Sequence, residues 1–328
     1  VTDKNALNMG RDAACQLRFD EHAGNARIIQ CRKEFCLFQK RQKLALRFLG
    51  GKGNGAEFPV GEQRSIHAAN QLSGELIARA PARVYAPLEL FPQLDLTPYR
   101  GRTEFFAVLP RIYRTQDEPV LRALLEDAMK KGVTGVSLGN LGHLSLVRGL
   151  DVTLHGGWPL NLYNSAALDF WKGEGLASAC VSFELRDAQL RDLSKCIPCE
   201  AIVYGRLPLM LTENCLNANE FGCKHFASRP VSVPTDGACA SAPELTDRRG
   251  ERFPVLRAWG CRSEIENGKI LYLADKLSDW QSLGLRYALL RFTTESPEEC
   301  VCMLRAYQGE AVEPPTDITR GLFYRGAE

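Results

Sequence analysis

Four cysteines in the C-terminal half of this 328-residue chain are the side chains best suited to hold a metal. Cys215, Cys223, Cys239 and Cys261 are separated by 7, 15 and 21 residues. The sequence between them is rich in Gly, Pro, Asn and charged residues, which predicts loops. In a reducing compartment, thiolates on such loops hold a metal or an iron–sulfur centre more often than they form disulfides. Their spacing is wider than the paired cysteines of tetrahedral zinc sites, so zinc, an iron–sulfur cluster and free thiols all stay open.

Polar residues at the ends of predicted strands form a second constellation. In a parallel barrel, the carboxyl ends of the strands meet at the face that carries the active site. We therefore expect these side chains to line a pocket, although each could be an ordinary polar residue at a strand end. The candidates are His155 after DVTL, Glu184 after CVSF, Arg111 after FFAVLP and Tyr204 after CEAIV, with Asn161 and Asn164 as additional members.

Three familiar catalytic sequence motifs give little support to a catalytic assignment. GVSLG at 135–139 matches the nucleophile elbow, but Ser137 falls inside a predicted strand and not on the turn after it. CIPC at 196–199 follows a predicted helix, whereas a redox pair needs a helix N-terminus to lower its thiol pKa. The sequence contains no H-E-x-x-H zinc motif. The residues thus argue against a serine hydrolase, a thiol oxidoreductase and a zinc-helix peptidase.

Strands alternate with helices from Arg102 onward. FFAVLPRIY, VTGVSL, DVTLH, ASACVSFEL and CEAIVYG read as strands, and helices are predicted at Glu118–Lys131 and Asn164–Gly175. This alternation predicts parallel βαβ units. No glycine fingerprint follows a strand, which favours a barrel over a dinucleotide-binding sheet. About seven strand candidates lie before Tyr204, one short of a closed eight-stranded barrel. We therefore expect an α/β, TIM-like barrel that is incomplete or irregular on its N-terminal side.

The predicted domain organisation has three parts. Residues 1–100 form a β-rich region that belongs in part to the barrel, although 62–80 read as a helix. Residues 101–210 form the main barrel portion. Residues 211–328 hold the cysteine-rich segment, which we expect to cap the barrel mouth, and a small α+β region whose helix starts at Ser296. Because the first residue is Val1, we expect an N-terminal portion of the same polypeptide to be missing.

Composition bounds the class of protein. The chain is 45% hydrophobic and 24% charged, which is ordinary for a globular protein. It has no apolar run long enough for a spanning helix and no signal segment, so we expect a cytoplasmic protein without a membrane partner. A net charge of +2 is too mild to establish a nucleic-acid partner. Basic residues between Arg32 and Arg47 alternate with phenylalanines, which suits either base stacking or a half-buried sheet.

The stretches TLHGGWPLNLYNSAALDFWKGEGLASACVSFELRDAQL and CEAIVYGRLPLMLTENC resemble the collagenase-like peptidase family U32. GRLPLMLTENC, LTDRRGERFPVL and TRGLFYRG look like the C-terminal half of its larger members, which carry an additional domain of unknown function. The resemblance covers the chain from Arg102 to its end. The chain departs from the family pattern at Leu216, where proline usually follows the first cysteine, and at Tyr204, where His is common.

The resemblance implies a cofactor and a reaction. Relatives hold a 4Fe–4S cluster on four cysteines, which correspond to Cys215, Cys223, Cys239 and Cys261, and aerobic preparation can lose the cluster or replace it with zinc. Several relatives act in oxygen-independent hydroxylation of ribosomal or transfer RNA, and prephenate is implied as a co-substrate. The expected function is therefore RNA hydroxylation. The alternatives are a metal- or cysteine-dependent peptidase, with a peptide as substrate, and a non-catalytic substrate-binding half of a larger enzyme.

Overall fold

The chain divides into two compact units, Val1–Phe38 and Gln39–Glu328. A computed structural model describes residues 74–79, 81–223, 243–276, 279 and 282–325 (for Gly74 and Ile77 the backbone alone), together with the backbone of five strands nearer the N-terminus. The first unit contains a three-stranded antiparallel sheet. Its strands are β1 (Leu7–Asn8), β2 (Gln16–Phe19) and β3 (Ala26–Gln30).

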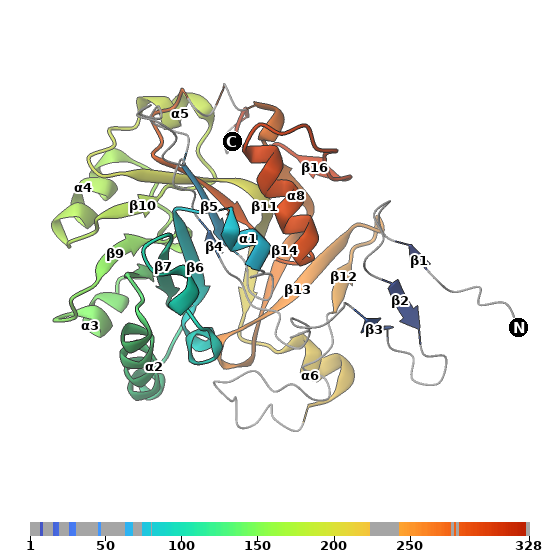
Figure 1. Cartoon of the computed structure of the whole chain (residues 1–328), viewed down its shortest axis with the longest axis horizontal. Coiled ribbons are helices and arrows are strands. Elements are labelled where there is room, and N and C mark those ends of the chain that lie inside the picture. Colours follow the sequence, from blue (N-terminus) through green and yellow to red (C-terminus); the bar gives the residue numbers. More distant parts are fainter. Residues whose placement is uncertain are drawn as a thin grey trace, which may run out of the picture. The chain divides into compact units, whose positions relative to one another are not determined.

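Eight parallel strands of the second unit pair side by side in a ring (Figure 1). Each strand from β5 to β10 pairs in parallel with the next, and β10 pairs with β11. The strand β15 then pairs in parallel with both β11 and β5, so the sheet curls back on itself. The prediction of an α/β fold with a barrel-like sheet is confirmed. The strands are β5 (Gln63–His67), β6 (Arg83–Pro87), β7 (Glu104–Val108), β8 (Gly135–Leu138), β9 (Thr153–Gly156), β10 (Ser178–Cys180), β11 (Cys199–Thr212) and β15 (Tyr287–Arg291).

The helices between the strands follow their local capping signals. The helix α2 (Glu118–Lys131) ends at Gly132, whose φ of 97° is left-handed and suits glycine. The helix α4 (Ser165–Gly173) starts at Asn164, whose side chain accepts a hydrogen bond from the Ala167 amide. The other helices are α1 (Gly74–Ala78), α3 (His143–Val147), α5 (Asp187–Asp192), α6 (Leu216–Phe221) and α8 (Pro297–Tyr307), with short 3₁₀ helices η1 (Leu88–Gln93), η2 (Thr97–Tyr99), η3 (Thr115–Asp117), η4 (Trp158–Leu160), η6 (Trp259–Cys261) and η7 (Ala274–Lys276).

The segment between the ring strands β11 and β15, part of which the sequence predicted as loops, contains an antiparallel ribbon. The outer half of β11 leaves the ring and pairs with β14, which pairs in turn with β13, and β13 pairs with β12. The loop prediction for the residues between the cysteines was wrong at α6, β12 and β13, because β13 pairs with β14, which lies outside that stretch. The strands are β12 (Glu244–Thr246), β13 (Arg252–Ala258) and β14 (Arg262–Tyr272). In addition, β16 (Ile318–Thr319) pairs with β14, and β4 (Ala45–Leu46) pairs with both β5 and β6.

The helix predicted over 62–80 is also corrected. Its first part is the ring strand β5, and of the residues that the structure describes in this range, Gly74–Ala78 are helical. The strand β5 obtains its partners from β15, more than 200 residues away in the chain, and from β6. Such long-range pairing overrides a weak local helical preference.

The core fills the ring and the space between the ring and its helices. Val84, Phe106, Val136 and Leu290 are fully buried along four ring strands. The helix α8 covers part of the outside of the ring with a buried face that includes Leu304. Within the described residues, no helix is long and apolar enough to cross a membrane.

Candidate functional site

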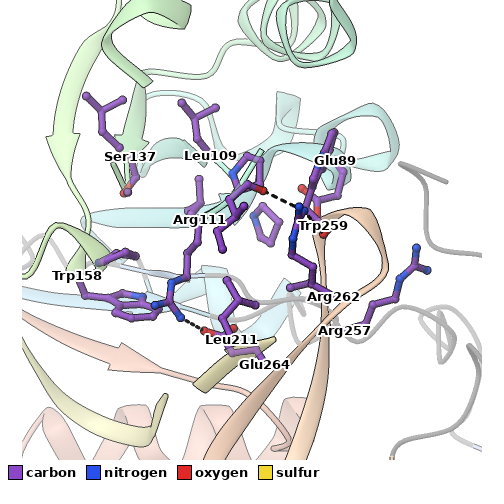
Figure 2. A pocket seen from close by; sticks show the side chains of 18 residues that line it. Glu89, Leu109, Arg111, Ser137, Trp158, Leu211, Arg257, Trp259, Arg262 and Glu264 are labelled. Atoms are coloured by element: carbon purple, nitrogen blue, oxygen red, sulfur yellow. Dashed lines mark hydrogen bonds and ion pairs between the residues drawn. The ribbon is translucent and has the colours of Figure 1, made fainter. Parts of the chain in front are cut away.

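A pocket lies at the carboxyl ends of three ring strands. Pro87, Val108 and Ser137, from the ends of β6, β7 and β8, contribute to its base. The turn between β13 and β14 covers the opposite side with Trp259 and Arg262 (Figure 2). Its cavity volume is about 90 Å³, several times the ~10–15 Å³ that one water molecule needs. The pocket therefore occupies the face where a parallel barrel carries its active site.

Arg111 is the predicted strand-end residue that lines this pocket. Its guanidinium donates a hydrogen bond of 3.0 Å to Glu264 Oε1, and its carbon Cζ lies 4.6 Å from the centre of the Trp158 ring. Burial lowers the pKa of Arg111, and the charge of nearby Arg291 lowers it further. A guanidinium held by one carboxylate and one aromatic face is positioned to bind an anionic or planar group.

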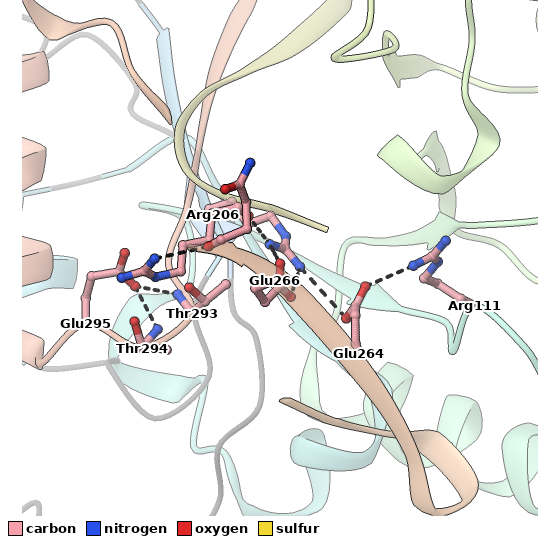
Figure 3. A network of polar contacts seen from close by, with 9 residues as sticks. Arg111, Arg206, Glu264, Glu266, Thr293, Thr294 and Glu295 are labelled. Carbon is pink, nitrogen blue, oxygen red and sulfur yellow. Dashed lines mark hydrogen bonds and ion pairs between the residues drawn. The ribbon is translucent and has the colours of Figure 1, made fainter. Parts of the chain in front are cut away.

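A buried network stands behind Arg111 (Figure 3). Arg291 donates a hydrogen bond of 2.7 Å to each carboxylate oxygen of Glu266, and its Nη2 lies 3.8 Å from Glu264 Oε2. Glu264 therefore connects Arg111 to Arg291. Because Arg291 also lies 5.4 Å from the Trp158 ring, this network orders two residues of the pocket wall.

The covering turn is fastened to the barrel by Arg262, which is 3% exposed. Its Nε donates a hydrogen bond of 2.8 Å to Glu213, and its Nη1 donates to the carbonyl groups of Ile112 and Trp259 at 3.2 and 3.1 Å. The contact with Ile112 joins the ribbon to the segment that follows β7. The turn thus has a fixed position over the pocket.

Cys261 lies in this turn, beside the pocket. It is buried and has a φ of 57°, a left-handed conformation that is uncommon for a residue other than glycine. Arg257, which lines the pocket, donates a hydrogen bond of 3.5 Å to Cys261 Sγ. Burial raises the pKa of the Cys261 thiol, Arg257 lowers it, and Cys215 and Cys223 raise it by their charge. These three thiols are therefore near enough to interact electrostatically.

The fourth predicted ligand, Cys239, lies outside the described residues. Cys215 is buried at the start of α6, and Cys223 is half-buried shortly after that helix. In the part of the chain that the structure describes, no group of three or more His, Cys, Asp or Glu side chains is arranged to hold a metal ion. Thiolates suit a sulfur-ligated centre by their chemistry, and the set of ligands that the sequence predicts includes Cys239.

His155 lies inside the ring and not in the pocket. Its Nδ1 lies 2.9 Å from Ser178 Oγ and its Nε2 lies 3.4 Å from Glu200 Oε1. Arg83 donates a hydrogen bond of 2.6 Å to Ser178, and Tyr85 donates one of 3.3 Å to Glu200. Burial lowers the pKa of His155, against the opposing effect of Glu200. His155 is 1% exposed and Glu200 is 0% exposed, so these groups form a polar layer of the core.

The remaining predicted pocket residues also lie away from this pocket. Tyr204 packs between the ring and α8, where its hydroxyl donates to Glu295 at 3.3 Å and burial raises its pKa well above the usual value. Glu184 is half-buried after β10. Asn161 is exposed with a φ of 48°, and Asn164 caps α4. Of the six candidates, Arg111 lines the pocket.

The residues of the GVSLG and CIPC motifs have structural environments, as the sequence predicted. Ser137 lies within β8 and is 4% exposed, so it does not stand on a sharp turn. Cys199 is the first residue of β11, and burial raises its pKa to about 12, which leaves the thiol protonated at neutral pH. Neither residue has the environment of a nucleophile.

Sequence reasoning missed Glu89 as a residue of the pocket. It follows β6 by two residues, within η1. Burial raises its pKa from 4.5 to about 7, and the opposing effects of a backbone hydrogen bond and of Arg257 are smaller. The signal was present, since Glu89 is a polar residue just after a strand in ARVYAPLEL, but that strand was assigned to the region before the main barrel.

Comparisons with known proteins identify a family and distant likenesses to solved structures. No curated protein matches the chain. The solved structure of the U32 peptidase Mk0906 is 17% identical, with a TM-score of 0.28 over 36% of this chain, and the chain spans 51% of the length of that structure. A putative sporulation-specific glycosylase, ydhD from Bacillus subtilis, is 11% identical with a TM-score of 0.30 over 77% of this chain and 97% of its own. The sequence profile of peptidase family U32 matches residues 76–241, which is half of the chain. The chain therefore belongs to peptidase family U32.

Proposed function

We propose that this chain is the catalytic part of an iron–sulfur enzyme that hydroxylates RNA without molecular oxygen, built on a TIM-like barrel. Cys215, Cys223, Cys239 and Cys261 would hold a 4Fe–4S cluster. The observation that carries the proposal is the hydrogen bond between Arg257 and Cys261 Sγ, because Arg257 lines the pocket at the strand ends. A centre on Cys261 would therefore face the pocket across a single side chain.

The bound cluster would supply the redox chemistry of the reaction. The protein would supply binding and orientation. Arg111 presents its guanidinium group to the pocket, which Arg257 also lines, and prephenate, a dicarboxylate, would be held there as co-substrate. Trp158 and Trp259 offer aromatic surface to a planar base. The covering turn, fixed by Arg262, would keep the reacting groups away from bulk water.

No contact in the described residues supports peptidase activity as the Arg257–Cys261 contact supports the proposed cluster site. A Ser–His–Glu arrangement does exist in Ser178, His155 and Glu200, with separations of 2.9 and 3.4 Å. A peptidase needs its nucleophile to reach a peptide carbonyl. Ser178 is 1% exposed, and Arg83 already donates to its hydroxyl, so this arrangement is better explained as a layer of the core.

Iron content and RNA modification test the proposal together. Protein purified without oxygen should be brown and contain about four irons per chain. Single Cys→Ala substitutions at 215, 223, 239 and 261 should each lower the iron content. The matched control is Cys302→Ala, since Cys302 is an exposed cysteine on α8 and should leave it unchanged. Mass spectrometry of ribosomal and transfer RNA incubated with the reconstituted protein should show added oxygen. A colourless, iron-free protein under these conditions would refute the proposal.

A further inference from the structure

Glu89 is placed where a parallel barrel carries its reactive groups. It lies in η1, immediately beyond the carboxyl end of the ring strand β6. Its neighbours in η1, Leu88 and Phe91, are 0% exposed and anchor the helix in the core. Lys131 holds the same helix by donating hydrogen bonds of 2.9 and 2.5 Å to the carbonyl groups of Phe91 and Pro92. The backbone that carries Glu89 is therefore held from two sides.

The carboxyl group of Glu89 belongs to the same pocket as Arg111 and Trp158. In Figure 2 it lies beside Trp259, on the wall opposite Trp158. The apolar residues Val108, Leu109 and Pro110 line the pocket with it. Burial against these apolar residues disfavours the charged form of Glu89, as desolvation does in buried acids generally.

The charged groups that face the pocket come from every element around Glu89. Arg257 comes from β13, Arg262 and Glu264 from β14, and Arg111 from the segment after β7. Glu264 is engaged by Arg111 at 3.0 Å, and Arg262 is engaged by Glu213 at 2.8 Å. Arg257 favours the ionised form of Glu89, yet the pKa of Glu89 remains about 7 because burial outweighs it. At neutral pH the group is present in both protonation states, as an efficient proton-transfer catalyst requires.

We propose that Glu89 is a catalytic acid–base residue of this pocket, which exchanges a proton with a hydroxyl group or a water molecule bound there. The carboxylate takes the proton as the O–H bond of the bound group breaks, and it becomes a carboxylic acid. In the reverse direction the acid returns the proton to an oxyanion. The role in hydroxylation rests on the proposed function, whereas the neutral-pH titration of Glu89 does not.

Two measurements on the full chain test this inference. Infrared difference spectra between pH 5 and 9 should show a carboxylic-acid band that titrates with a midpoint near 7, and Glu89→Gln should remove it. In the hydroxylation assay, Glu89→Gln should lower kcat by ~10²–10⁴-fold and remove the neutral limb of the pH–rate profile. Glu126→Gln, which changes an exposed carboxyl group on α2, should alter neither measurement.

The outcomes separate the two proposals. The absence of a wild-type band that titrates near pH 7 overturns the assignment of Glu89, whatever the enzyme does. An unchanged pH–rate profile in Glu89→Gln overturns its catalytic role even if the band titrates near 7. If the band behaves as expected but no RNA is hydroxylated, the proposed function fails while Glu89 remains a neutral-pH proton donor and acceptor in the pocket.

Discussion

Arg291 and Glu266 form a bidentate ion pair in which both side chains are 0% exposed. The pair joins the ring strand β15 to the ribbon strand β14. Since Arg291 also approaches Glu264 and the Trp158 ring, the pair fixes the geometry behind the pocket. This ion pair therefore affects both the stability of the fold and the shape of the candidate site.

Arg291→Met should destabilise the protein by about 3–5 kcal/mol, because it leaves the Glu266 carboxylate buried without its partner. The measurement is the free energy of unfolding in urea. Arg305→Met is the matched control, since Arg305 forms its ion pair with Glu310 on the surface and should contribute little. Equal effects of the two substitutions would contradict the importance assigned to the buried pair.

Gly205 allows β11 to approach β15 at Arg291. Its φ is 116°, and a Cβ atom at this position would lie 1.9 Å from the Arg291 carbonyl oxygen. Gly205→Ala should therefore destabilise the fold far more than Gly149→Ala, where φ is 84° but no atom lies within 4 Å of the added Cβ. The control should cost about 1 kcal/mol from backbone strain alone. Thermal unfolding distinguishes them, and similar melting temperatures would refute the close approach.

Local signals in the sequence predicted the best-marked helix well and the ribbon poorly. Glu118–Lys131 is a helix with the predicted bounds, because its periodicity and the glycine that follows it are both local features. The strand Arg262–Tyr272 was missed because it places the charged residues Glu264 and Glu266 in the interior, where distant arginines neutralise them. A hydrophobicity pattern cannot register a partner 25 or more residues away.

The same limit applies to the site. Arg111 was found because it follows a strand that the sequence marks clearly. The strand-end rule also selected His155 and Tyr204, but they lie within β9 and β11, where hydrogen bonds to Glu200 and Glu295 hold them in the core and under α8. Glu89 was missed because its unusual ionisation comes from burial against residues of β7 and of the covering turn, which only the folded chain brings together.

Asn164 has a structural role that can be measured. Its Oδ1 accepts a hydrogen bond of 2.8 Å from the Ala167 amide at the start of α4. Asn164→Ala should lower the free energy of unfolding by about 1 kcal/mol, because the amide loses its partner. Asn164→Ser, which can still accept this bond, should recover most of the loss. If Asn164→Ser is as unstable as Asn164→Ala, capping does not explain the residue.

His143 should make the fold sensitive to acid. Its Nδ1 accepts a hydrogen bond of 2.9 Å from the Gly139 amide, so Nε2 carries the proton and donates to the Pro110 carbonyl at 3.0 Å. Burial lowers its pKa from 6.5 to about 4. A depressed pKa means that the unfolded chain binds the proton first as the pH falls. The stability from the neutral ring is therefore complete above pH 6.5 and is lost progressively down to about pH 4.

The comparison of wild type with His143→Gln measures this effect. The stability advantage of the wild type should shrink by up to about 3 kcal/mol between pH 6.5 and 4, which corresponds to the size of the pKa shift. Other groups titrate in both proteins and cancel in the difference. The check is urea unfolding at several pH values, and a difference that does not vary with pH would refute the burial of a neutral ring.

Glu89 should affect stability in the opposite direction. Its folded-state pKa of about 7 lies above the ordinary value of 4.5, so the folded chain holds the proton more tightly than the unfolded chain does. The stability of the wild type must therefore fall as the pH rises from 4.5 to 7, because the unfolded chain releases this proton in that range while the folded chain retains it. Above pH 7 the folded chain must ionise a desolvated carboxyl group. Glu89→Gln removes this cost, since the amide stays neutral at every pH.

The stability gain of Glu89→Gln over the wild type should accordingly grow between pH 4.5 and 7 and then level off. Its upper limit is about 3 kcal/mol from the size of the shift. Glu126→Gln on the exposed face of α2 should show no such growth. If Glu89→Gln stabilises the protein and also removes the neutral limb of the pH–rate profile, then Glu89 serves the reaction at a cost in stability. A gain that is constant with pH would show instead that the carboxyl group is solvated like any other.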